Sequence, residues 1–396
     1  MKSSQSVEDG TNSLQNQSDG GRRWIRRLGR LTAHFLVAGF LIGVASSSVA
    51  ANYTYIDLGT LGGRDSRAFG INNFGSVVGF SALPGDLYSH AALWTTSSRT
   101  DLGTLGGAFS AAFAINNAGQ VTGYSGITGN VYAAHATRWD GTSPTDLGTL
   151  GGRDSAGFAI NSAGHVGGYS WTAGLSDHHP TVWNGSVPTD LGTPSQTYGI
   201  AYGINNGGQV VGVDEGWATV WSGGVATRLT GLGGLAATAY AINDAGQIAG
   251  SSPLTPVNGN PVVLATRWDG NSPIALGSLG GMQSFAYAIN GGGQVAGASY
   301  LAGDTVKHAT LWIGVVVTDL NTFIDASAAQ AGWYLEEARG INDNEWIVGI
   351  AKNRLTGETH AYLLTPVPEP ASWLLALAGL GMLTVASRRN RSNTPP

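Results

Sequence analysis

The sequence predicts an all-β protein, namely a seven-bladed β-propeller of four-stranded repeats. The first observation is that Asp-Leu-Gly-Thr-Leu-Gly-Gly occurs at 57–63, 101–107 and 146–152. The second is that the pair Ile-Asn recurs seven times, at 71–72, 115–116, 160–161, 204–205, 242–243, 289–290 and 341–342. The unit length is about 44 residues, and a period of 40–50 residues is typical of propellers and arrays.

Each unit contains four strand candidates in a fixed order. An apolar segment ending in Ile-Asn comes first, followed by Gln-Val-Val-Gly or a relative, as at 209–212. A His-Ala-x-x-Trp segment, as at 90–94, and the Asp-Leu-Gly segment complete the unit. Turns such as Asn-Asn-Ala-Gly at 116–119 suit tight hairpins, because Asn and Gly tolerate positive φ. The first two strands of each unit should therefore pair directly.

The phase of the repeat predicts how the ring closes. The first Asp-Leu-Gly, at 57–59, precedes any Ile-Asn turn, whereas the last unit, at 341–364, ends without an Asp-Leu-Gly. We therefore expect residues 53–59 to be the fourth strand of the final blade. Such an exchange removes the open sheet edges of an array. An open β-solenoid is the alternative, although its coils are usually shorter and need no Trp at one fixed place per unit.

The repeats resemble those of the HAF family of bacterial extracellular repeat proteins. The resemblance spans most of 53–364, and the pair His-Ala carries it at 90–91, 135–136, 308–309 and 360–361, together with the Ile-Asn-x-x-Gly-x-Val turns. The aromatic residue of that motif is replaced by Ala92, Thr137, Thr310 and Tyr362. The resemblance implies an extracellular location and a repeat architecture rather than an activity.

Residues 1–51 have the three parts of a secretory signal peptide. A long basic region is followed by an apolar, helical stretch at 31–44 and by small residues at 46–51, which predicts cleavage after Ala50 or Ala51. An N-terminal membrane anchor is the alternative. The pair Arg22-Arg23 leaves a twin-arginine route open, although Arg26 stands where that motif prefers an apolar residue. The repeat body is expected at 52–365.

The C-terminal segment, 366–396, predicts a sorting signal. Val367, Pro368, Glu369 and Pro370 precede an uncharged stretch at 371–387, which as a helix would rise about 25 Å. Arg388, Arg389 and Arg391 follow, and this basic cluster should stay in the cytoplasm.

Pro-Glu-Pro, a short apolar helix and an Arg cluster at a chain end resemble the PEP-CTERM sorting signal of Gram-negative bacteria. The resemblance implies an exosortase-type membrane protease as partner, which cuts near Pro-Glu-Pro. It also implies export across the inner membrane, transient anchoring there by 371–387, and release or transfer to the cell surface, commonly among exopolysaccharide. A plain C-terminal anchor beside a chance Pro-Glu-Pro is the alternative.

Composition excludes several classes of function. Residues 52–365 contain 11 Lys and Arg against 21 Asp and Glu, so the body is acidic. Nucleic-acid binding needs clustered Lys and Arg, and we therefore expect no nucleic-acid partner. The chain has no Cys, which rules out disulfides, thiolate metal sites and cysteine nucleophiles.

We find no catalytic, cofactor-binding or metal-binding set in the sequence. The recurring His residues could line a channel and bind a metal, but we expect strand residues bonded to a neighbouring blade. The recurring Asp should cap turn amides beside a Gly bend. Trp residues at one position per unit could stack on sugars, but burial between blades is commoner. These sets are His90, His135, His179, His308 and His360; Asp57, Asp101, Asp146, Asp190 and Asp319; and Trp94, Trp139, Trp183, Trp221, Trp268 and Trp312.

Segments that differ between units are the better candidates for binding. They occur at 83–89, 171–178, 252–261 and 323–337, and we expect them to share one face. The last contains an aromatic and acidic cluster, Trp333, Tyr334, Glu336 and Glu337, as candidate ligand loop. The leading hypothesis is a non-enzymatic cell-surface or matrix protein that binds exopolysaccharide or another surface protein through such loops. Alternatives are a polysaccharide-active enzyme with a site at the channel mouth, and a purely structural surface protein.

Overall fold

A computed structural model describes residues 52–174, 177–192, 198–255 and 262–367. The chain divides into two units, Met1–Ala51 and Asn52–Pro396, and the described residues all belong to the second. Their regular secondary structure is almost all β-strand, with two short helices, which confirms the predicted all-β class. The predicted helical segments at 31–44 and 371–387 lie outside the described residues.

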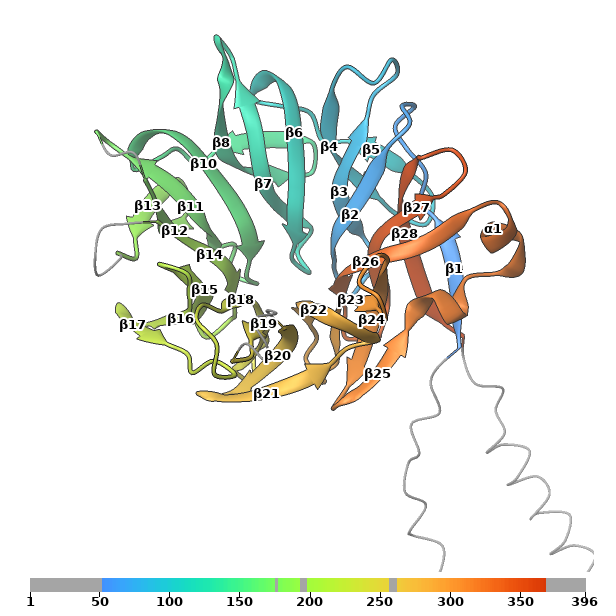
Figure 1. Cartoon of the computed structure of the whole chain (residues 1–396). Helices are drawn as coiled ribbons and strands as arrows, with labels where there is room; N and C mark the ends of the chain where they lie inside the picture. The colour runs from blue at the N-terminus through green and yellow to red at the C-terminus, as the bar shows by residue number, and fades with distance from the viewer. Residues whose placement is uncertain (1–51, 175–176, 193–197, 256–261, 368–396) are drawn as a thin grey trace, which may run out of the picture. The chain divides into compact units, whose positions relative to one another are not determined.

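The described strands form antiparallel meanders of four (Figure 1). Four of these sheets are β2 (Ser66–Ile71), β3 (Val77–Ala82), β4 (Ser89–Trp94) and β5 (Arg99–Asp101); β6 (Gly106–Ile115), β7 (Gln120–Ile127), β8 (Asn130–Asp140) and β9 (Ser143–Asp146); β10 (Gly151–Ile160), β11 (Val166–Thr172), β12 (His178–Asn184) and β13 (Val187–Asp190); and β14 (Gly199–Ile204), β15 (Val210–Asp214), β16 (Trp217–Ser222) and β17 (Val225–Arg228).

Two further meanders are joined into one eight-stranded sheet. They are β18 (Thr238–Ile242), β19 (Gln247–Pro253), β20 (Val263–Asp269) and β21 (Ser272–Gly277); and β22 (Gly280–Ile289), β23 (Val295–Leu301), β24 (Lys307–Ile313) and β25 (Val316–Asp319). The join is a single parallel residue pair, Val263 with Gln283. Within each meander the four strands pair in chain order, as in the other sheets.

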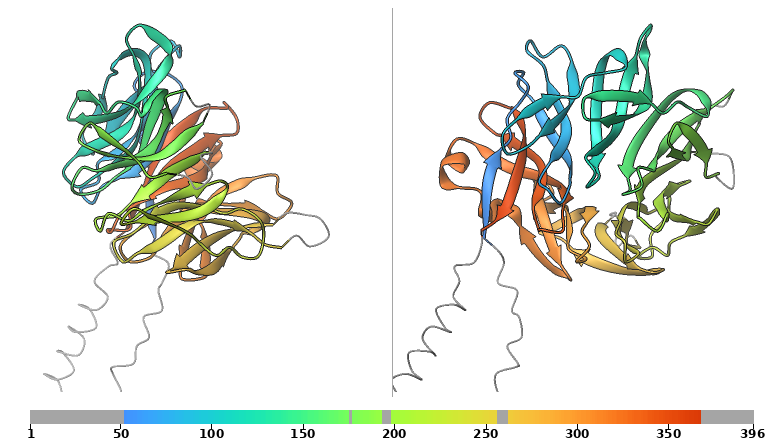
Figure 2. Two further views of the ribbon diagram at one scale, coloured as in Figure 1. Left: turned by 90° about the vertical axis from the view of Figure 1, so that its left-hand side faces the viewer. Right: turned by 180° about the vertical axis from the view of Figure 1, so that it is seen from behind.

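The last sheet combines the two ends of the described body. Its strands are β26 (Trp333–Ile341), β27 (Ile347–Asn353), β28 (Thr359–Pro366) and β1 (Tyr53–Asp57). β1 runs antiparallel to β28, from Tyr53 opposite Pro366 to Asp57 opposite Tyr362, and the two strands lie side by side in both views (Figure 1, Figure 2). The prediction that the first strand completes the last sheet is confirmed; the strand ends two residues earlier than expected.

Hydrogen bonds between the Ile-Asn turns link each sheet to the next. In each turn the Asn side-chain oxygen accepts backbone amide hydrogen bonds, as Asn72 does from Phe74 and Ser76. Its side-chain nitrogen donates to the backbone oxygen of the Asn in the following unit. The seven bonds run from Asn72 to Asn116, Asn161, Asn205, Asn243, Asn290 and Asn342, and back to Asn72, at 2.9–3.3 Å. Tight hairpins between the first two strands of the units are thus confirmed.

The Gly that ends Gln-Val-Val-Gly is needed for close packing between the first two strands. A Cβ at Gly79 would lie 1.8 Å from the Arg67 backbone oxygen, beside the bulge between Ala68 and Gly70. Gly123, at the same place in the next unit, would meet Ala111 at 1.9 Å. Only Gly fits where two backbones approach this closely, which explains why the residue recurs.

The core lies between consecutive sheets. Trp139, which is fully buried, packs with Val78 and Ala91 of the preceding sheet. Trp268 likewise packs against Val211 and Ala218. The six recurring Trp residues are at most 2% exposed, so the prediction that they are buried is confirmed. Full burial of such large side chains contributes roughly 2–3 kcal/mol each and fixes neighbouring sheets together.

Two short helices interrupt the β pattern. A 3₁₀ helix, η1 (Leu320–Phe323), and α1 (Ala326–Gln330) connect β25 to β26. Asp325 caps α1 by accepting from the Ala328 amide at 2.8 Å. No helix within the described ranges is long and apolar enough to cross a membrane.

Candidate functional site

The recurring His and Asp residues are partners of one another. The His90 Nδ1 lies 2.9 Å from an Asp101 carboxylate oxygen, and the same pairing occurs in His135–Asp146, His179–Asp190, His308–Asp319 and His360–Asp57. Each pair lies within one sheet, so the expectation that these His residues bond to a neighbouring blade is wrong. In each pair the His lies on the third strand of its sheet and the Asp on the fourth, and the register of these two adjacent strands places the two side chains within hydrogen-bond distance.

Each of these Asp residues also caps a turn, as predicted. The amides of Gly59, Gly103, Gly148 and Gly192 donate to the Asp two residues earlier at 2.7–2.8 Å. Both oxygens are therefore engaged, and the recurring carboxylates are not free for chemistry. Among the described residues no three His, Asp or Glu side chains gather closely enough to hold a metal ion.

A row of aromatic side chains links the first strands of successive units. Phe69, Phe113, Phe158, Tyr202, Tyr240 and Tyr287 contact one another in that order, with ring centroids 5.0–5.5 Å apart. Arg339 occupies the same place in the last unit. Its guanidinium lies 3.9 Å from the Tyr287 ring centroid and 6.0 Å from that of Phe69. The sequence signal for this row is an aromatic residue two positions before the Ile of six of the seven Ile-Asn pairs, and no site was predicted from it.

A polar depression lies among the seven Ile-Asn turns. Its volume is about 300 Å³, and its lining consists of the three residues that begin each turn. The acids on its rim are engaged within the protein: Asp343 accepts from the Gly291 amide at 2.8 Å, and Asp244 from the Asn206 amide at 2.9 Å. A catalytic acid pair at this mouth thus has no support from these two carboxylates.

In the candidate ligand loop at 323–337, the aromatic and acidic residues lie in a strand and not in a loop. Trp333, Tyr334, Glu336 and Glu337 all belong to β26, so that part of the prediction is wrong. β-Strand formation is favoured because the segment pairs along β27, from Trp333 opposite Asn353 to Ile341 opposite Ile347. A bulge between Leu335 and Glu337 shifts the register.

Contacts within the protein occupy all four residues. Trp333 lies 4.5 Å from the His360 ring, and Tyr334 lies below the Arg354 guanidinium at 4.5 Å. Glu336 pairs with Lys352 at 2.8 Å, whereas the buried Glu337 pairs with both Lys307 and Arg339. Burial alone would raise the pKa of Glu337, but these two cations lower it below the usual value. A ligand role for this cluster stays a prediction, and its charges are already matched.

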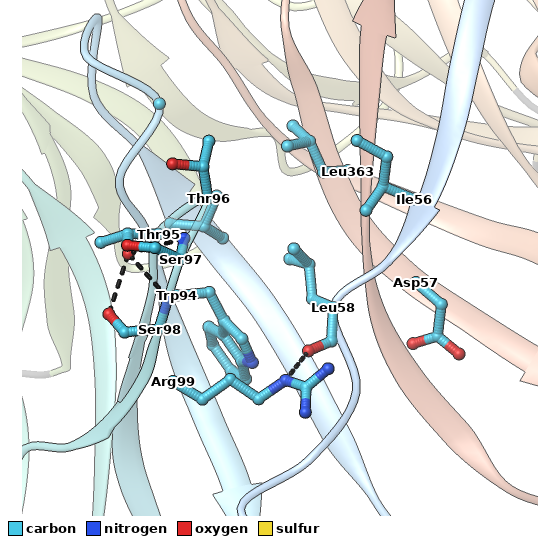
Figure 3. A pocket seen from close by; sticks show the side chains of 12 residues that line it. Ile56, Asp57, Leu58, Trp94, Thr95, Thr96, Ser97, Ser98, Arg99 and Leu363 are labelled. Carbon is cyan, nitrogen blue, oxygen red and sulfur yellow. Dashed lines mark hydrogen bonds between the residues drawn. The ribbon is translucent and has the colours of Figure 1, made fainter.

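A cavity larger than the seven-turn depression lies between the first and last sheets. It measures about 640 Å³ and is lined on one side by Ile56, Asp57, Leu58 and Leu363, and on the other by Gly75, Val77, Trp94 and residues 95–99 (Figure 3). The Arg99 Nε donates to the Leu58 backbone oxygen at 2.6 Å. Residues 95–98 form the β4–β5 hairpin. This hairpin lies near the Asn72–Gly75 turn, because Val77, just after the turn, is paired with Trp94, just before the hairpin.

This cavity is at the opposite end of the sheets from the described residues of the variable segments singled out by sequence. Those segments connect the second to the third strand of a unit, or one unit to the next, whereas the cavity lies beside a hairpin between third and fourth strands. Signal-cleavage residues Ala50 and Ala51, sorting residues Pro368, Glu369 and Pro370, and Arg388, Arg389 and Arg391 lie outside the described residues. Val367 is described, and its amide donates to the Asn52 oxygen at 2.7 Å.

Comparison with known protein families gives one match. Residues 366–391 match the PEP-CTERM protein-sorting motif. This motif points to an exported protein that is sorted by exosortase and processed at its C-terminus. No curated protein matches the chain.

Proposed function

We propose that the chain is an exported, non-enzymatic cell-surface or matrix protein, whose repeat body binds exopolysaccharide. The sorting motif beside the last described strand supports this location, because exosortase substrates pass to the cell exterior. Residues 1–51 would act as signal peptide, with cleavage at Ala50 or Ala51. Residues 371–387 would anchor the chain in the inner membrane until the protease acts.

The repeat body is proposed to be a closed seven-bladed propeller of the HAF type. The cycle of seven Asn hydrogen bonds, which returns to Asn72, supports closure. The pairing of β1 with β28 supports it independently. The recurring His, Asp and Trp would then stabilise the ring rather than bind a ligand, since all three sets are engaged within the protein.

Ligand binding is proposed at a place where one unit departs from the others. The observation that carries this proposal is the 640 Å³ cavity, since ligand sites are concave and of about 300–1,000 Å³. The alternatives are a polysaccharide-active enzyme and a purely structural protein. The first has little support at the seven-turn depression, where Asp244 and Asp343 are both bonded to backbone amides.

The direct test is a glycan array and an exopolysaccharide pull-down with the full chain. Retention of at least one acidic or neutral polysaccharide is expected, and the heat-unfolded protein is the control. Absence of retention of every polysaccharide would contradict the binding function and favour a structural role. Release of new reducing ends during the same incubation would favour the enzyme instead.

A further inference from the structure

We propose that the cavity between β1 and the β4–β5 hairpin is a binding site for an anionic saccharide, one that presents a sugar carboxylate to Arg99. This inference rests on the proposed function and narrows it to one ligand class and one site. It is argued from three features of the cavity: an Arg that the other units lack, its unused hydrogen-bond donors, and a hairpin made of hydroxyl residues.

Arg99 stands where five other sheets carry small apolar residues and where the last sheet carries Tyr55, opposite Leu364. In six units the recurring Trp is paired with one residue of the outer strand, and in this sheet the pair is Trp94 with Arg99. The residues opposite Trp139, Trp183, Trp221, Trp268 and Trp312 are Pro144, Pro188, Ala226, Pro273 and Val317. Proline and alanine suffice to build the strand, so the fold does not require a guanidinium at this place.

The Arg99 guanidinium is only partly used by the protein. Its Nε donates to the Leu58 oxygen, and neither terminal nitrogen has a hydrogen-bond partner within the described residues. The residue is exposed, and its guanidinium extends between the two walls of the cavity (Figure 3). A planar guanidinium with free N–H groups binds carboxylates with two parallel hydrogen bonds.

The one acid of the lining does not compete for Arg99 by a hydrogen bond. One Asp57 oxygen lies 2.8 Å from His360 Nδ1, and the other accepts from the Gly59 amide at 2.7 Å. The Arg99 charge contributes to the lowered pKa of Asp57, after the larger effects of burial, which opposes the shift, and of these hydrogen bonds. An incoming anion would therefore meet a cation that shares the cavity with a carboxylate already bonded to other donors.

The opposite wall offers hydroxyl groups for a sugar. Residues 95–98 read Thr-Thr-Ser-Ser, whereas the equivalent hairpin at 140–143 reads Asp-Gly-Thr-Ser. The Thr95 and Ser98 hydroxyls bond to each other at 2.9 Å, and those of Thr96 and Ser97 extend from exposed residues. Hydroxyls both donate and accept, as sugar hydroxyls require. Trp94 is 1% exposed and forms part of the apolar floor with Leu58 and Leu363, rather than a stacking platform.

The test uses the full chain, trigalacturonic acid as the acidic probe, and its fully methyl-esterified form as a neutral probe of the same ring structure. Calorimetric titration at low salt should show binding of the acid, and binding of the ester at least about tenfold weaker, because the charge-assisted bonds are lost. Arg99→Ala should weaken acid binding at least about tenfold and leave ester binding within about twofold. Alanine is tolerated at the equivalent position, Ala226.

Arg153→Ala is the matched control, because it removes an equal charge from an exposed Arg that is paired with Asp154. It should leave the affinity within about twofold of the wild type. A second variant, Ser97→Glu, adds a negative charge on the exposed rim and should weaken acid binding severalfold. If Arg99→Ala and Ser97→Glu both bind the acid like the wild type, the site is wrong while the proposed function stands. Equal binding of acid and ester overturns the anionic class. A protein that retains no saccharide on the array overturns both proposals.

Discussion

The Asn342 side-chain nitrogen donates to the backbone oxygen of Asn72 at 2.9 Å, across 270 residues of chain. Both residues are buried in their turns, and each belongs to the same cycle of Asn contacts. Six of the seven contacts join neighbours in sequence, whereas this one joins the last unit to the first. The bond thus links the two ends of the repeat array through the same geometry that joins its interior units.

Asn342→Ala should lower the free energy of unfolding by about 2–4 kcal/mol. The substitution removes the bond to Asn72 and leaves the Asn344 and Trp346 amides without their acceptor in a partly buried turn. Denaturant unfolding followed by tryptophan fluorescence measures the change. Asn344→Ala is the matched control: Asn344 is exposed in the same turn and donates to the Asn73 oxygen, so its loss should cost less than about 1 kcal/mol. Equal effects of the two variants would show that the buried cycle of Asn hydrogen bonds contributes no more to the free energy of unfolding than an exposed hydrogen bond does.

Asp214→Ser should stabilise the protein by about 1–3 kcal/mol at neutral pH. Asp214 is 1% exposed, and neither carboxylate oxygen has a hydrogen-bond partner. It occupies the place of Ser81 and Ser125, which are paired with the equivalent first strands. The sequence at this place therefore departs from the repeat at a cost in stability.

The gain from Asp214→Ser should depend on pH. Burial, with repulsion from Glu215 in addition, raises the pKa of Asp214. Because the folded protein holds this proton more tightly, the penalty is absent below the unfolded pKa of about 4 and complete above the folded pKa. Thermal unfolding between pH 3 and 8 checks this, with exposed Asp177→Ser as control. A gain that is constant over this range would argue against a charged buried carboxylate.

His360→Gln should weaken the attachment of β1 mainly between about pH 4 and 6.5. Burial alone would lower the pKa of His360, but the hydrogen bond and charge of Asp57 raise it overall. The stabilisation by protonated His is full below its unfolded pKa of about 6.5 and is lost as the pH rises through the folded pKa. The pKa of Asp57 is lowered despite burial. The contribution of the ionised Asp57 to stability is therefore lost as the pH falls through the pKa of Asp57 in the folded protein.

Because both side chains of the His360–Asp57 pair are partly exposed, the expected loss is only about 0.5–1 kcal/mol. Amide hydrogen exchange of β1, compared at pH 5 and pH 8, resolves such a local effect. His165→Gln, in the turn between β10 and β11, is the control. At each pH, the exchange rate of β1 in His360→Gln is divided by the rate in the wild type. A larger ratio at pH 8 than at pH 5 would contradict a stabilising role of the protonated His360.

Glu337→Gln should destabilise the protein by about 2–4 kcal/mol, because Lys307 and Arg339 would lose their buried carboxylate. Since the pKa of Glu337 is lowered, this stabilisation is present above the unfolded pKa and disappears as the pH falls through the folded pKa. Glu336→Gln, which breaks the more exposed pair with Lys352, should cost less than about 1 kcal/mol. If Glu337→Gln keeps full stability but loses saccharide retention, the cluster at 333–337 is a ligand site after all.

Repetition made the strand pattern predictable. The seven Ile-Asn turns fix where adjacent strands reverse, and the unpaired Asp-Leu-Gly at 57–59 predicts that β1 pairs with β28. The partner of each recurring His was not predictable in this way. His90 and Asp101 are eleven residues apart, and only the register of β4 and β5 brings them together. Likewise, the sequence at 323–337 departs from the repeat, but pairing with β27 makes its end a strand.

The sequence alone determined the class of fold, the phase of its units and the C-terminal sorting motif, because each depends on the order of neighbouring residues along the chain. Tertiary structure decided which residues are available for binding. The recurring His and Asp pair with each other within a sheet, the recurring Trp are buried, and the acids of 333–337 are paired with cations. Arg99 does not stand out in the sequence. It becomes distinctive because the register places it opposite Trp94, whereas the residues opposite the other five recurring Trp are Pro, Ala or Val.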